Sequence, residues 1–245
     1  MPAGGRLSAM LSIEERLARL DWEAIEGSLR DWGWIKTPRL LTPEECAELI
    51  RLYADDRRFR SHIDMARYRF GLGEYKYCAY PLPPVVAALR AHAYPRLVPI
   101  ANRWEAALGR QSRYPAELES FLAICAEHGQ TKPTPLLLRY GVGGHNRLHQ
   151  DLYGEVAFPL QLTCVLSRRG DDYTGGESLL VEHAPRAQSR GDVVTLEQGE
   201  ALIFATRHRP VKGARGYHRV SMRHGVSRLL SGERYSLGVI FHDAA

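Results

Sequence analysis

The sequence has no uninterrupted apolar stretch approaching the roughly 20 residues of a membrane-spanning helix, so we expect no membrane segment. The N-terminus reaches Glu14 and Glu15 before a long apolar run forms, and it therefore does not read as a secretory signal. None of the four cysteines stands in a Cys-x-x-Cys pair, the spacing that favours a redox motif or a zinc–thiolate site. These absences predict a cytoplasmic protein with reduced, buried thiols.

Internal repeats and low-complexity linkers are also missing, and 245 residues are enough for one sizeable core. The 33 lysines and arginines outnumber the 28 aspartates and glutamates, which gives a net charge of +5 at pH 7. This mild excess permits a polyanionic partner such as nucleic acid but does not require one. Seven of the ten histidines fall between His145 and His242, so the chemistry is sought in that part of the chain.

The first part of the chain, residues 1–133, reads as mainly helical and is expected to pack on a barrel formed by the rest. Ser12 and Thr42 are each followed three residues later by glutamate, the spacing of a capping box at a helix start. Further helices are expected over 85–92, 97–108 and 115–128, the first two separated by Pro95.

One segment, residues 67–80, interrupts this helical pattern. Aromatic and basic side chains alternate there around two glycines, which predicts a β-hairpin with its aromatic rings on one face. Rings interleaved with positive charge are suited to stacking a flipped-out base and holding phosphate, and the alternative is an amphipathic hairpin that only covers the barrel. The candidate substrate-binding residues are Arg67, Tyr68, Arg69, Tyr75 and Tyr77.

From residue 134 onward the chain changes to short apolar segments separated by turns rich in Gly, Asp and Asn. Many short strands at regular spacing are typical of a sandwich or barrel rather than a parallel α/β sheet. We therefore predict an α+β fold in which residues 134–245 form a jelly-roll catalytic core beside a helical subdomain. The expected strands are 136–138, 160–166, 178–181, 193–196, 201–205 and 235–241.

Within this core, His149 and Asp151 form a His-x-Asp motif. In an extended strand residues i and i+2 point to the same side, so the imidazole and the carboxylate face one point. Two histidines and one carboxylate suit Fe(II) and leave coordination positions open, whereas zinc favours a closed tetrahedron of nitrogen and sulfur. A third ligand must come from the far side of the barrel, and the candidates are His208, His218 and His224.

Spacing favours His224, because Arg234 follows it by ten positions on an apolar strand next to the expected metal-binding strand. A guanidinium at that place can hold a carboxylate through two parallel hydrogen bonds. The carboxylate would be the distal end of a 2-oxo acid whose other end chelates the metal. Ser236 shares the strand face of Arg234 and is expected to touch the same carboxylate.

The order of these motifs resembles a known superfamily. The His-x-Asp motif, the Thr174–Glu177 turn (TGGE), the segment 199–204 and the histidine–arginine pair are similar to the Fe(II)/2-oxoglutarate-dependent oxygenases of the prolyl 4-hydroxylase type. Residues 139–151 resemble the AlkB nucleic-acid demethylases, although Leu138 and Ile240 replace an asparagine and an arginine of that pattern. The whole chain is similar to a bacterial family of 2OG-Fe(II) oxygenases described as acting on damaged DNA.

The resemblance implies a double-stranded β-helix enzyme that uses Fe(II), 2-oxoglutarate and O2, and couples 2-oxoglutarate decarboxylation to hydroxylation of a C–H bond. The expected partner is alkylated DNA or RNA, and the expected role is DNA repair by oxidative demethylation. Two alternatives stay open: a hydroxylase of a protein side chain or small molecule, and a non-catalytic metal-binding jelly roll. The implied metal ligands are His149, Asp151 and His224, and the implied cosubstrate contacts are Arg234, Tyr140 and Ser236.

Overall fold

The computed structural model describes residues 11–111 and 113–245. The helices are α2 (Ile13–Ala18), α3 (Trp22–Asp31), α4 (Pro43–Leu52), the 3-10 turn η1 (Asp56–Arg58), α5 (Pro84–Ala107) and α6 (Leu118–Glu127). The strands are β1 (Trp34–Arg39), β2 (Phe59–Asp64), β3 (Gly71–Leu72), β4 (Glu74–Cys78), β5 (Leu136–Tyr140), β6 (His145–His149), β7 (Leu160–Val165), β8 (Tyr173–Gly175), β9 (Ser178–His183), β10 (Arg190–Val194), β11 (Glu200–Ala205), β12 (His208–Gly213), β13 (Gly216–Val226), β14 (Leu229–Gly232) and β15 (Arg234–Val239).

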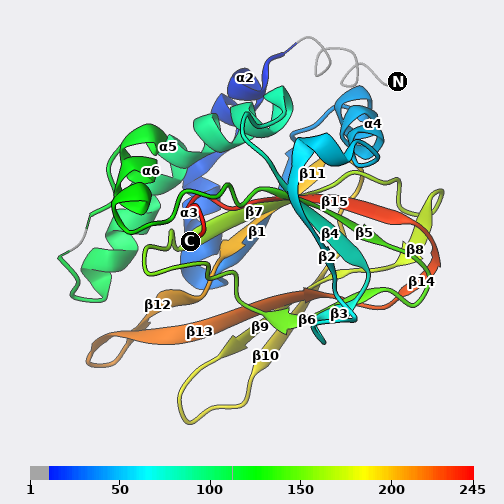
Figure 1. Ribbon diagram of the computed structural model, residues 1–245. Coiled ribbons are helices and arrows are strands. Elements are labelled where there is room, and N and C mark those ends of the chain that lie inside the picture. Colours follow the sequence, from blue (N-terminus) through cyan, green and yellow to red (C-terminus); the bar gives the residue numbers. More distant parts are fainter. Residues whose placement is uncertain (1–10, 112) are drawn as a thin grey trace.

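Two antiparallel sheets face each other, and helices cover the outer side of the larger one (Figure 1). The larger sheet has the strand order β1-β11-β7-β15-β5-β4-β2. The smaller sheet has the order β10-β9-β13-β6-β3, with β12 paired to β13, and β8 pairs with β14 apart from both. Strands distant in sequence are thus neighbours, and each sheet offers an inward face to a space between them.

Buried apolar side chains explain why the helices and the two sheets stack in layers. One apolar cluster joins the helices to the larger sheet, with Leu89 and Tyr94 of α5 packed in the same cluster as Leu162 of β7. A second cluster fills part of the space between the sheets and includes Val165 and Leu180. Apolar side chains removed from water on both faces of the larger sheet make it the centre of the molecule. No helix in the described ranges is long and apolar enough to cross a membrane.

Two predictions from local sequence are confirmed, the helix caps and the buried free cysteines. Ser12 and Thr42 both cap helices in full capping boxes, with Glu15 and Glu45 as the reciprocal partners. The four cysteines are buried and none forms a disulfide. Small apolar thiols in the core agree with the expected role of these residues as packing groups.

The prediction of two helices split by Pro95 is wrong, because α5 runs through both Pro95 and Pro99 without a break. The two prolines lie four residues apart and are exposed, so they share the solvent face of the helix. Carbonyl groups that lose their helical partners on that face remain accessible to water. The opposite face is held in the core by residues such as Tyr94 and Leu97.

The hairpin predicted over residues 67–80 has its first strand further upstream in the structure, at residues 59–64. Strand β2 pairs with β4, and residues 65–70 belong to the connection between them. A backbone hydrogen bond from Phe70 N–H to Met65 O closes this turn, and Arg69 adopts a φ of 60° within it. The aromatic rings therefore do not share one face. In addition, strands β1 and β2 lie in the first 133 residues outside the predicted hairpin, and β1 and β4 join the larger sheet by pairing with β11 and β5.

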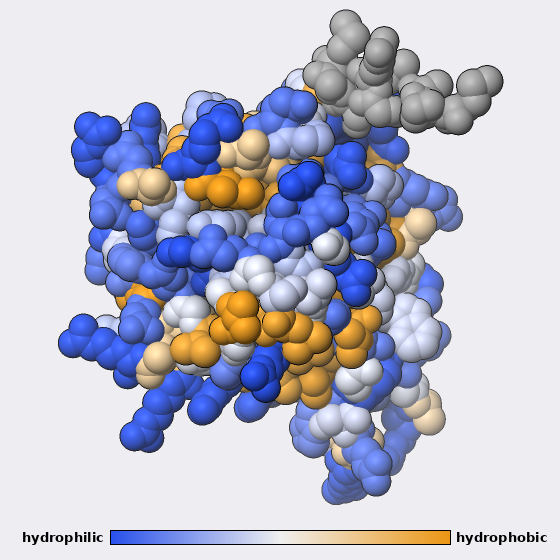
Figure 2. All heavy atoms as spheres, turned by 90° about the vertical axis from the view of Figure 1, so that its right-hand side faces the viewer, coloured by the Kyte–Doolittle hydropathy of each residue, from blue (hydrophilic) through white to orange (hydrophobic). Residues whose placement is uncertain are grey.

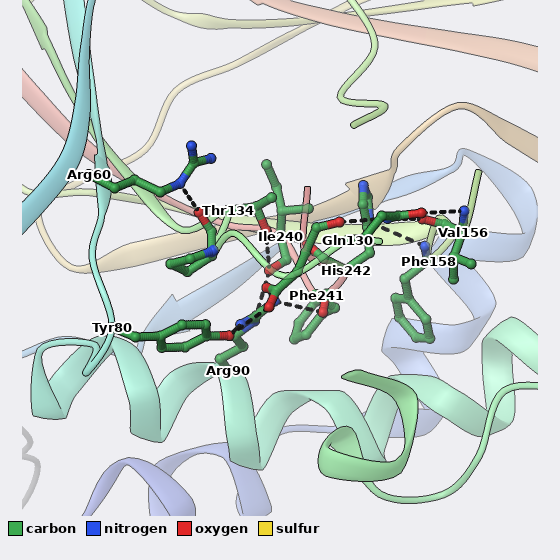
Figure 3. A network of polar contacts seen from close by, with 12 residues as sticks. Arg60, Tyr80, Arg90, Gln130, Thr134, Val156, Phe158, Ile240, Phe241 and His242 are labelled. Carbon is green, nitrogen blue, oxygen red and sulfur yellow. Dashed lines mark hydrogen bonds and ion pairs between the residues drawn. The ribbon is translucent and has the colours of Figure 1, made fainter. Parts of the chain in front are cut away.

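A buried polar network anchors the C-terminal residues to α5 (Figure 3). Arg90 of α5 forms a 2.7 Å ion pair with Asp243, and both side chains are almost fully buried. The same guanidinium donates hydrogen bonds to the carbonyl oxygens of Ile240 and Phe241 and to the hydroxyl of Tyr80. The buried guanidinium is thereby satisfied by protein groups, and the end of β15 is fixed to the helical layer.

Candidate active site

A cavity of about 500 Å³ lies between the two sheets. Its walls come from β4, β5, β7, β11 and β15 on one side and from β6, β9 and β13 on the other. Apolar residues such as Leu138, Leu202, Phe204 and Val226 cover much of its surface. The polar groups gather in two places, a His–Asp–His cluster and a buried arginine.

The cluster consists of His149, Asp151 and His224, whose nearest ligand atoms all lie within 4.8 Å of one another. His149 and His224 stand opposite each other in the register of β6 and β13. The Asp151 carboxylate approaches His224 Nε2 at 3.1 Å and His149 Nε2 at 3.5 Å. Of the three histidines considered for the third position, the structure therefore brings His224 to the motif.

Asp151 reaches the cluster from a loop and not from the expected extended strand, because β6 ends at His149. The side chain of Gln150 explains the exit. Its amide nitrogen donates hydrogen bonds to Met222 O at 2.7 Å and Ser221 Oγ at 3.1 Å, both on β13. Because Gln150 is fixed to β13, the side chains of His149 and Asp151 on either side of it still point to the same cluster.

Hydrogen bonds orient the donor atoms. His149 Nδ1 lies 2.7 Å from the carbonyl oxygen of Arg147, an arrangement that leaves Nε2 directed at the cluster. The hydroxyl of Tyr153 donates to Asp151 Oδ1 at 2.7 Å, and Gln161 Nε2 lies 3.3 Å from His224 Nε2. The ring of Phe204 is tilted against the ring of His224, with the two ring centroids 4.7 Å apart, and this contact limits rotation of the imidazole.

The three groups of the cluster shift one another's pKa values. Burial by itself would raise the pKa of the Asp151 carboxyl, but the charge of His224 and hydrogen bonds from both imidazoles hold that pKa well below its usual range. Burial and then the nearby His149 lower the pKa of His224. For His149, pairing with Asp151 outweighs burial and raises the pKa. An ionised Asp151 and a neutral His224 are in the state that ligates a metal, whereas His149 must give up a proton when the metal binds.

The donor set fits the expected metal. Two imidazole nitrogens and one carboxylate oxygen come from one side of the cavity, and the remaining lining is mostly carbon. Such a site leaves positions open for ligands from outside the protein, as Fe(II) oxygenases require and as a closed structural zinc site does not allow.

Arg234 is the second polar feature of the cavity. Its side chain is almost fully buried, with 2% of the residue exposed. Within the described part of the chain it forms no ion pair with a carboxylate, and its Nε has no hydrogen-bond partner. A buried guanidinium without an anion is costly, and an incoming carboxylate would remove that cost.

The neighbours of Arg234 hold it in the wall of the cavity. Arg234 pairs with Tyr140 in the register of β15 and β5, and its Nη1 donates to Ser236 Oγ at 3.2 Å. Burial raises the pKa of Tyr140 to about 12, so the phenol keeps a proton that it can donate to an anion. Gly176 adopts a φ of +63°, and a Cβ there would lie 3.0 Å from Arg234 Cδ and 2.5 Å from a Leu229 methyl group. The Thr174–Glu177 turn therefore needs glycine to make room for the arginine.

His208 and His218 lie elsewhere. His218 is exposed on β13, six residues before His224, and His208 borders a second cavity. Neither belongs to the group of metal-ligand candidates that the described residues form.

The five candidate substrate residues occupy three kinds of position. Arg69 and Tyr75 line the cavity, Arg67 and Tyr68 are exposed outside it, and Tyr77 is buried with 7% of its surface exposed. The Tyr77 ring packs edge-on against the rings of Tyr75 and Tyr153, with centroid distances of 5.4 and 5.8 Å. Tyr77 thus supports the tyrosine that bonds to Asp151 and is not among the residues that line the cavity.

Sequence reasoning missed several residues that the structure places at the site. Tyr153 and Gln161 contact the metal-ligand candidates, and Phe70, Arg147 and Leu148 border the cavity. Only Tyr153 carried a signal, since it stands two positions after Asp151. The others come from segments whose place depends on the pairing of distant strands.

Comparisons with known proteins agree with this geometry. Residues 73–244 match the model of a family named Oxygenase-NA and described as an oxygenase catalysing oxidative methylation of damaged DNA. An uncharacterized protein of Mycobacterium tuberculosis is 53% identical over 165 residues, which cover 67% of this chain and 71% of that protein.

Two solved structures show the same fold. A 2OG-Fe(II) oxygenase family oxidoreductase from Burkholderia pseudomallei has a TM-score of 0.51 and 14% identity, covering 93% of this chain and 94% of its own. A Trichoplax adhaerens prolyl hydroxylase, solved with a hypoxia inducible factor peptide, has a TM-score of 0.51 and 13% identity, covering 93% and 89%. The predicted α+β fold with a jelly-roll core is confirmed.

Proposed function

This chain belongs to the Oxygenase-NA family, and from that premise we propose that it removes methyl groups oxidatively from alkylated DNA or RNA. Membership makes the chain an oxygenase, as the sequence predicted. The proposed cofactors are Fe(II), 2-oxoglutarate and O2, supported by the His–Asp–His cluster and by the fold shared with a 2OG-Fe(II) oxygenase family protein. The substrate, the role in DNA repair and the cytoplasmic location are proposals.

The roles of the cavity residues follow from their positions. His149, Asp151 and His224 would hold the iron, and Arg234 would bind the distal carboxylate of 2-oxoglutarate. Tyr140 and Ser236 lie beside the guanidinium and would donate hydrogen bonds to the same carboxylate. When bound, the iron with 2-oxoglutarate and O2 supplies the oxidation of an unactivated C–H bond.

The chain itself supplies orientation and a dry environment. Tyr153 fixes one oxygen of Asp151 and keeps the carboxylate in place for the metal. The phenol of Tyr153 keeps its proton, because burial and then the charge of Asp151 raise its pKa well above the usual range. The apolar walls exclude water from the reacting group.

The observation that carries the nucleic-acid proposal is the rim of the cavity. The rings of Tyr68 and Phe70 are stacked with centroids 5.6 Å apart, and both residues are about half exposed. The cavity lining includes Phe70 itself and the neighbouring Arg69 and Arg147. Arg67 lies in the same turn as the two rings. Exposed rings flanked by guanidinium groups bind single-stranded nucleic acid by stacking bases and pairing with phosphates.

The surface around this rim is apolar over a wide area. Figure 2 views the molecule from the side on which β3, β8 and β14 lie and shows hydrophobic side chains gathered among hydrophilic ones. Exposed apolar residues of β3, of β14 and of the turns before β3 and after β5 include Phe70, Leu72, Val142 and Leu230. A surface of this kind accepts unpaired bases, whose faces are also apolar.

Removing either stacked ring is expected to weaken binding of a single-stranded oligonucleotide. Stacking contributes about 1–3 kcal/mol per base, so Tyr68→Ala or Phe70→Ala should lower affinity by roughly tenfold each. Fluorescence anisotropy at constant salt measures the change. Trp32→Ala is the matched control, since Trp32 is equally exposed and is not among the residues that line the cavity. Equal losses in the control and the two variants would contradict the proposed platform.

Replacing Arg234 is expected to impair use of 2-oxoglutarate. Loss of a buried charge-assisted pair costs about 1.5–3 kcal/mol, so Arg234→Met should raise the KM for 2-oxoglutarate by roughly 10- to 100-fold. Arg234→Lys should recover part of the loss, because a point charge remains. Arg223→Met, an exposed change on β13, serves as control. An unchanged KM in Arg234→Met would remove this residue from the cosubstrate site.

The proposed function is tested by its products. The purified protein with Fe(II), 2-oxoglutarate and air should release formaldehyde from a methylated single-stranded oligonucleotide and give succinate in equal amount. An unmethylated oligonucleotide of the same sequence should give no formaldehyde. If oligonucleotides stay unchanged while a peptide or small molecule gains a hydroxyl group, the nucleic-acid proposal is wrong and the alternative hydroxylase reaction is correct.

A further inference from the structure

A second cavity, of about 410 Å³, lies on the other side of the loop that carries Asp151. The C-terminal part of α5, α6, residues 152–159 and the start of β12 surround it. Only Leu152 borders both cavities, so the two spaces have separate linings. None of the groups assigned above to the metal or to 2-oxoglutarate faces this second cavity.

Two polar groups in its lining are buried without a hydrogen-bond partner. Thr206 is 1% exposed, and its hydroxyl has no partner. His208 Nδ1 is also buried and unpartnered. Such groups are rare in native proteins because each loses its bonds to water on burial. A ligand in the cavity would satisfy them, and the Thr206 hydroxyl can act as a donor to it.

The charge of the lining is positive. Three exposed arginines that border the cavity, Arg113, Arg207 and Arg219, form no ion pair within the described residues, whereas Arg110 is already paired with Glu105 at 3.1 Å. The one other acidic group of the lining is Glu155, which is also exposed. Unpaired guanidinium groups beside an unsatisfied hydroxyl form a set of donors for an anion.

The protonation of His208 agrees with this charge. Burial and then the neighbouring Arg219 and Arg207 lower the pKa of His208 to about 4. The imidazole is therefore neutral at physiological pH, and an arriving anion would meet the arginine charges without competition from a carboxylate near His208.

The apolar side of the cavity is rigid and aromatic. Trp104, Tyr114 and Phe158 contribute rings to it, and the Tyr114 hydroxyl donates to Ala157 O at 3.0 Å. Figure 3 shows how the adjoining segment is held: Gln130 bonds to both backbone groups of Val156, and Phe158 N–H donates to His242 Nδ1. A preformed wall of rings next to a cationic edge suits a ligand with a flat apolar part and a charged end.

We propose that this second cavity binds a phosphate ester, with Arg207 and Arg219 pairing with the phosphate oxygens and the Thr206 hydroxyl donating a further bond. A nucleotide places its phosphate at the arginines and its base or sugar against the rings. The phosphate belongs either to a free nucleotide or to a strand of nucleic acid that passes over the loop. Gln150, which lies between two metal-ligand candidates, also donates to Arg207 O at 3.3 Å, so the backbone of Arg207 connects the two cavities.

Isothermal titration with inorganic phosphate, a nucleoside monophosphate and a short single-stranded oligonucleotide tests the proposal. The wild type should bind the monophosphate, and Arg219→Gln and Thr206→Val should each weaken it by about tenfold or more. Arg215→Gln, an exposed change in the turn between β12 and β13, should leave affinity unchanged. Thr206→Val should not lower stability in urea, since the hydroxyl it removes has no partner in the protein.

The outcomes distinguish the sources and the two proposals. Displacement of the monophosphate by the oligonucleotide identifies the strand as the source, and phosphate or monophosphate binding without displacement identifies a free ligand. Absence of binding by all three probes, or equal binding in Arg219→Gln, Thr206→Val and wild type, would overturn the proposal. Asp151→Ala should keep the monophosphate affinity, because the readout needs neither metal nor turnover and is therefore independent of the demethylation proposal.

Discussion

Replacing His224 with alanine is expected to abolish metal-dependent oxidation, whereas replacing His218 with alanine leaves it intact. Both residues lie on β13, but only His224 reaches the Asp151 carboxylate, at 3.1 Å. Removing even a group that only supports a metal ligand costs about 10- to 100-fold in affinity, so loss of a direct ligand should exceed roughly 100-fold. Turnover of 2-oxoglutarate should fall with it, because the oxidation depends on the bound metal.

Anaerobic titration with Fe(II) measures this loss without reference to activity, and succinate formation measures the second effect. His218→Ala is the matched control, since its side chain is exposed on the same strand. Circular dichroism should show both variants folded, because each substitution keeps the backbone pairing of β13 with its neighbouring strands. Equal metal affinities of His224→Ala and wild type would exclude His224 as a ligand.

The second large effect concerns stability. Arg90→Met is expected to lower the free energy of unfolding by about 3–5 kcal/mol, the usual cost of removing one partner of a buried ion pair. The substitution leaves the Asp243 carboxylate buried without an ion pair, and only the Tyr80 hydroxyl still donates to it. It also removes the donors to Ile240 O and Phe241 O (Figure 3). These contacts hold the C-terminal residues, so the fixed end of β15 should loosen as well.

Urea unfolding compares this variant with Arg96→Met. Arg96 is an exposed arginine on the same helix, and its loss should change stability by less than about 0.5 kcal/mol. The double variant Arg90→Met/Asp243→Leu should recover much of the loss, because no charge is then left unpaired. A small effect of Arg90→Met alone would mean that water or another group satisfies Asp243.

The parts of the molecule that the sequence predicted have strong local patterns. The apolar segments expected at 136–138, 160–166, 178–181 and 201–205 are strands β5, β7, β9 and β11, because buried strands need apolar side chains wherever they pair. The His149–Asp151 motif and Arg234 were recognisable for a similar reason. Few structural roles place an imidazole, a carboxylate and a guanidinium at such spacings among apolar strands.

The missed parts depend on tertiary context. Strand β1 contains Lys36, Pro38 and Arg39, a weak strand pattern that is stabilised by pairing with β11. The β12–β13 hairpin is rich in exposed histidine, lysine and arginine, so it shows no apolar alternation. Pro95 and Pro99 remain helical because of the core behind them, which a local rule about proline does not include. The second cavity likewise joins segments more than a hundred residues apart.

The most direct test of the central claim is the anomalous scattering of iron in crystals grown anaerobically with Fe(II) and 2-oxoglutarate. The expected result is one metal peak bonded to His149 Nε2, an Asp151 carboxylate oxygen and His224 Nε2, with the distal carboxylate of 2-oxoglutarate on Arg234. Bond lengths should be about 2.0–2.2 Å, as for nitrogen and oxygen ligands of similar metals. A peak elsewhere, or a fourth protein ligand that closes the coordination shell, would contradict the account.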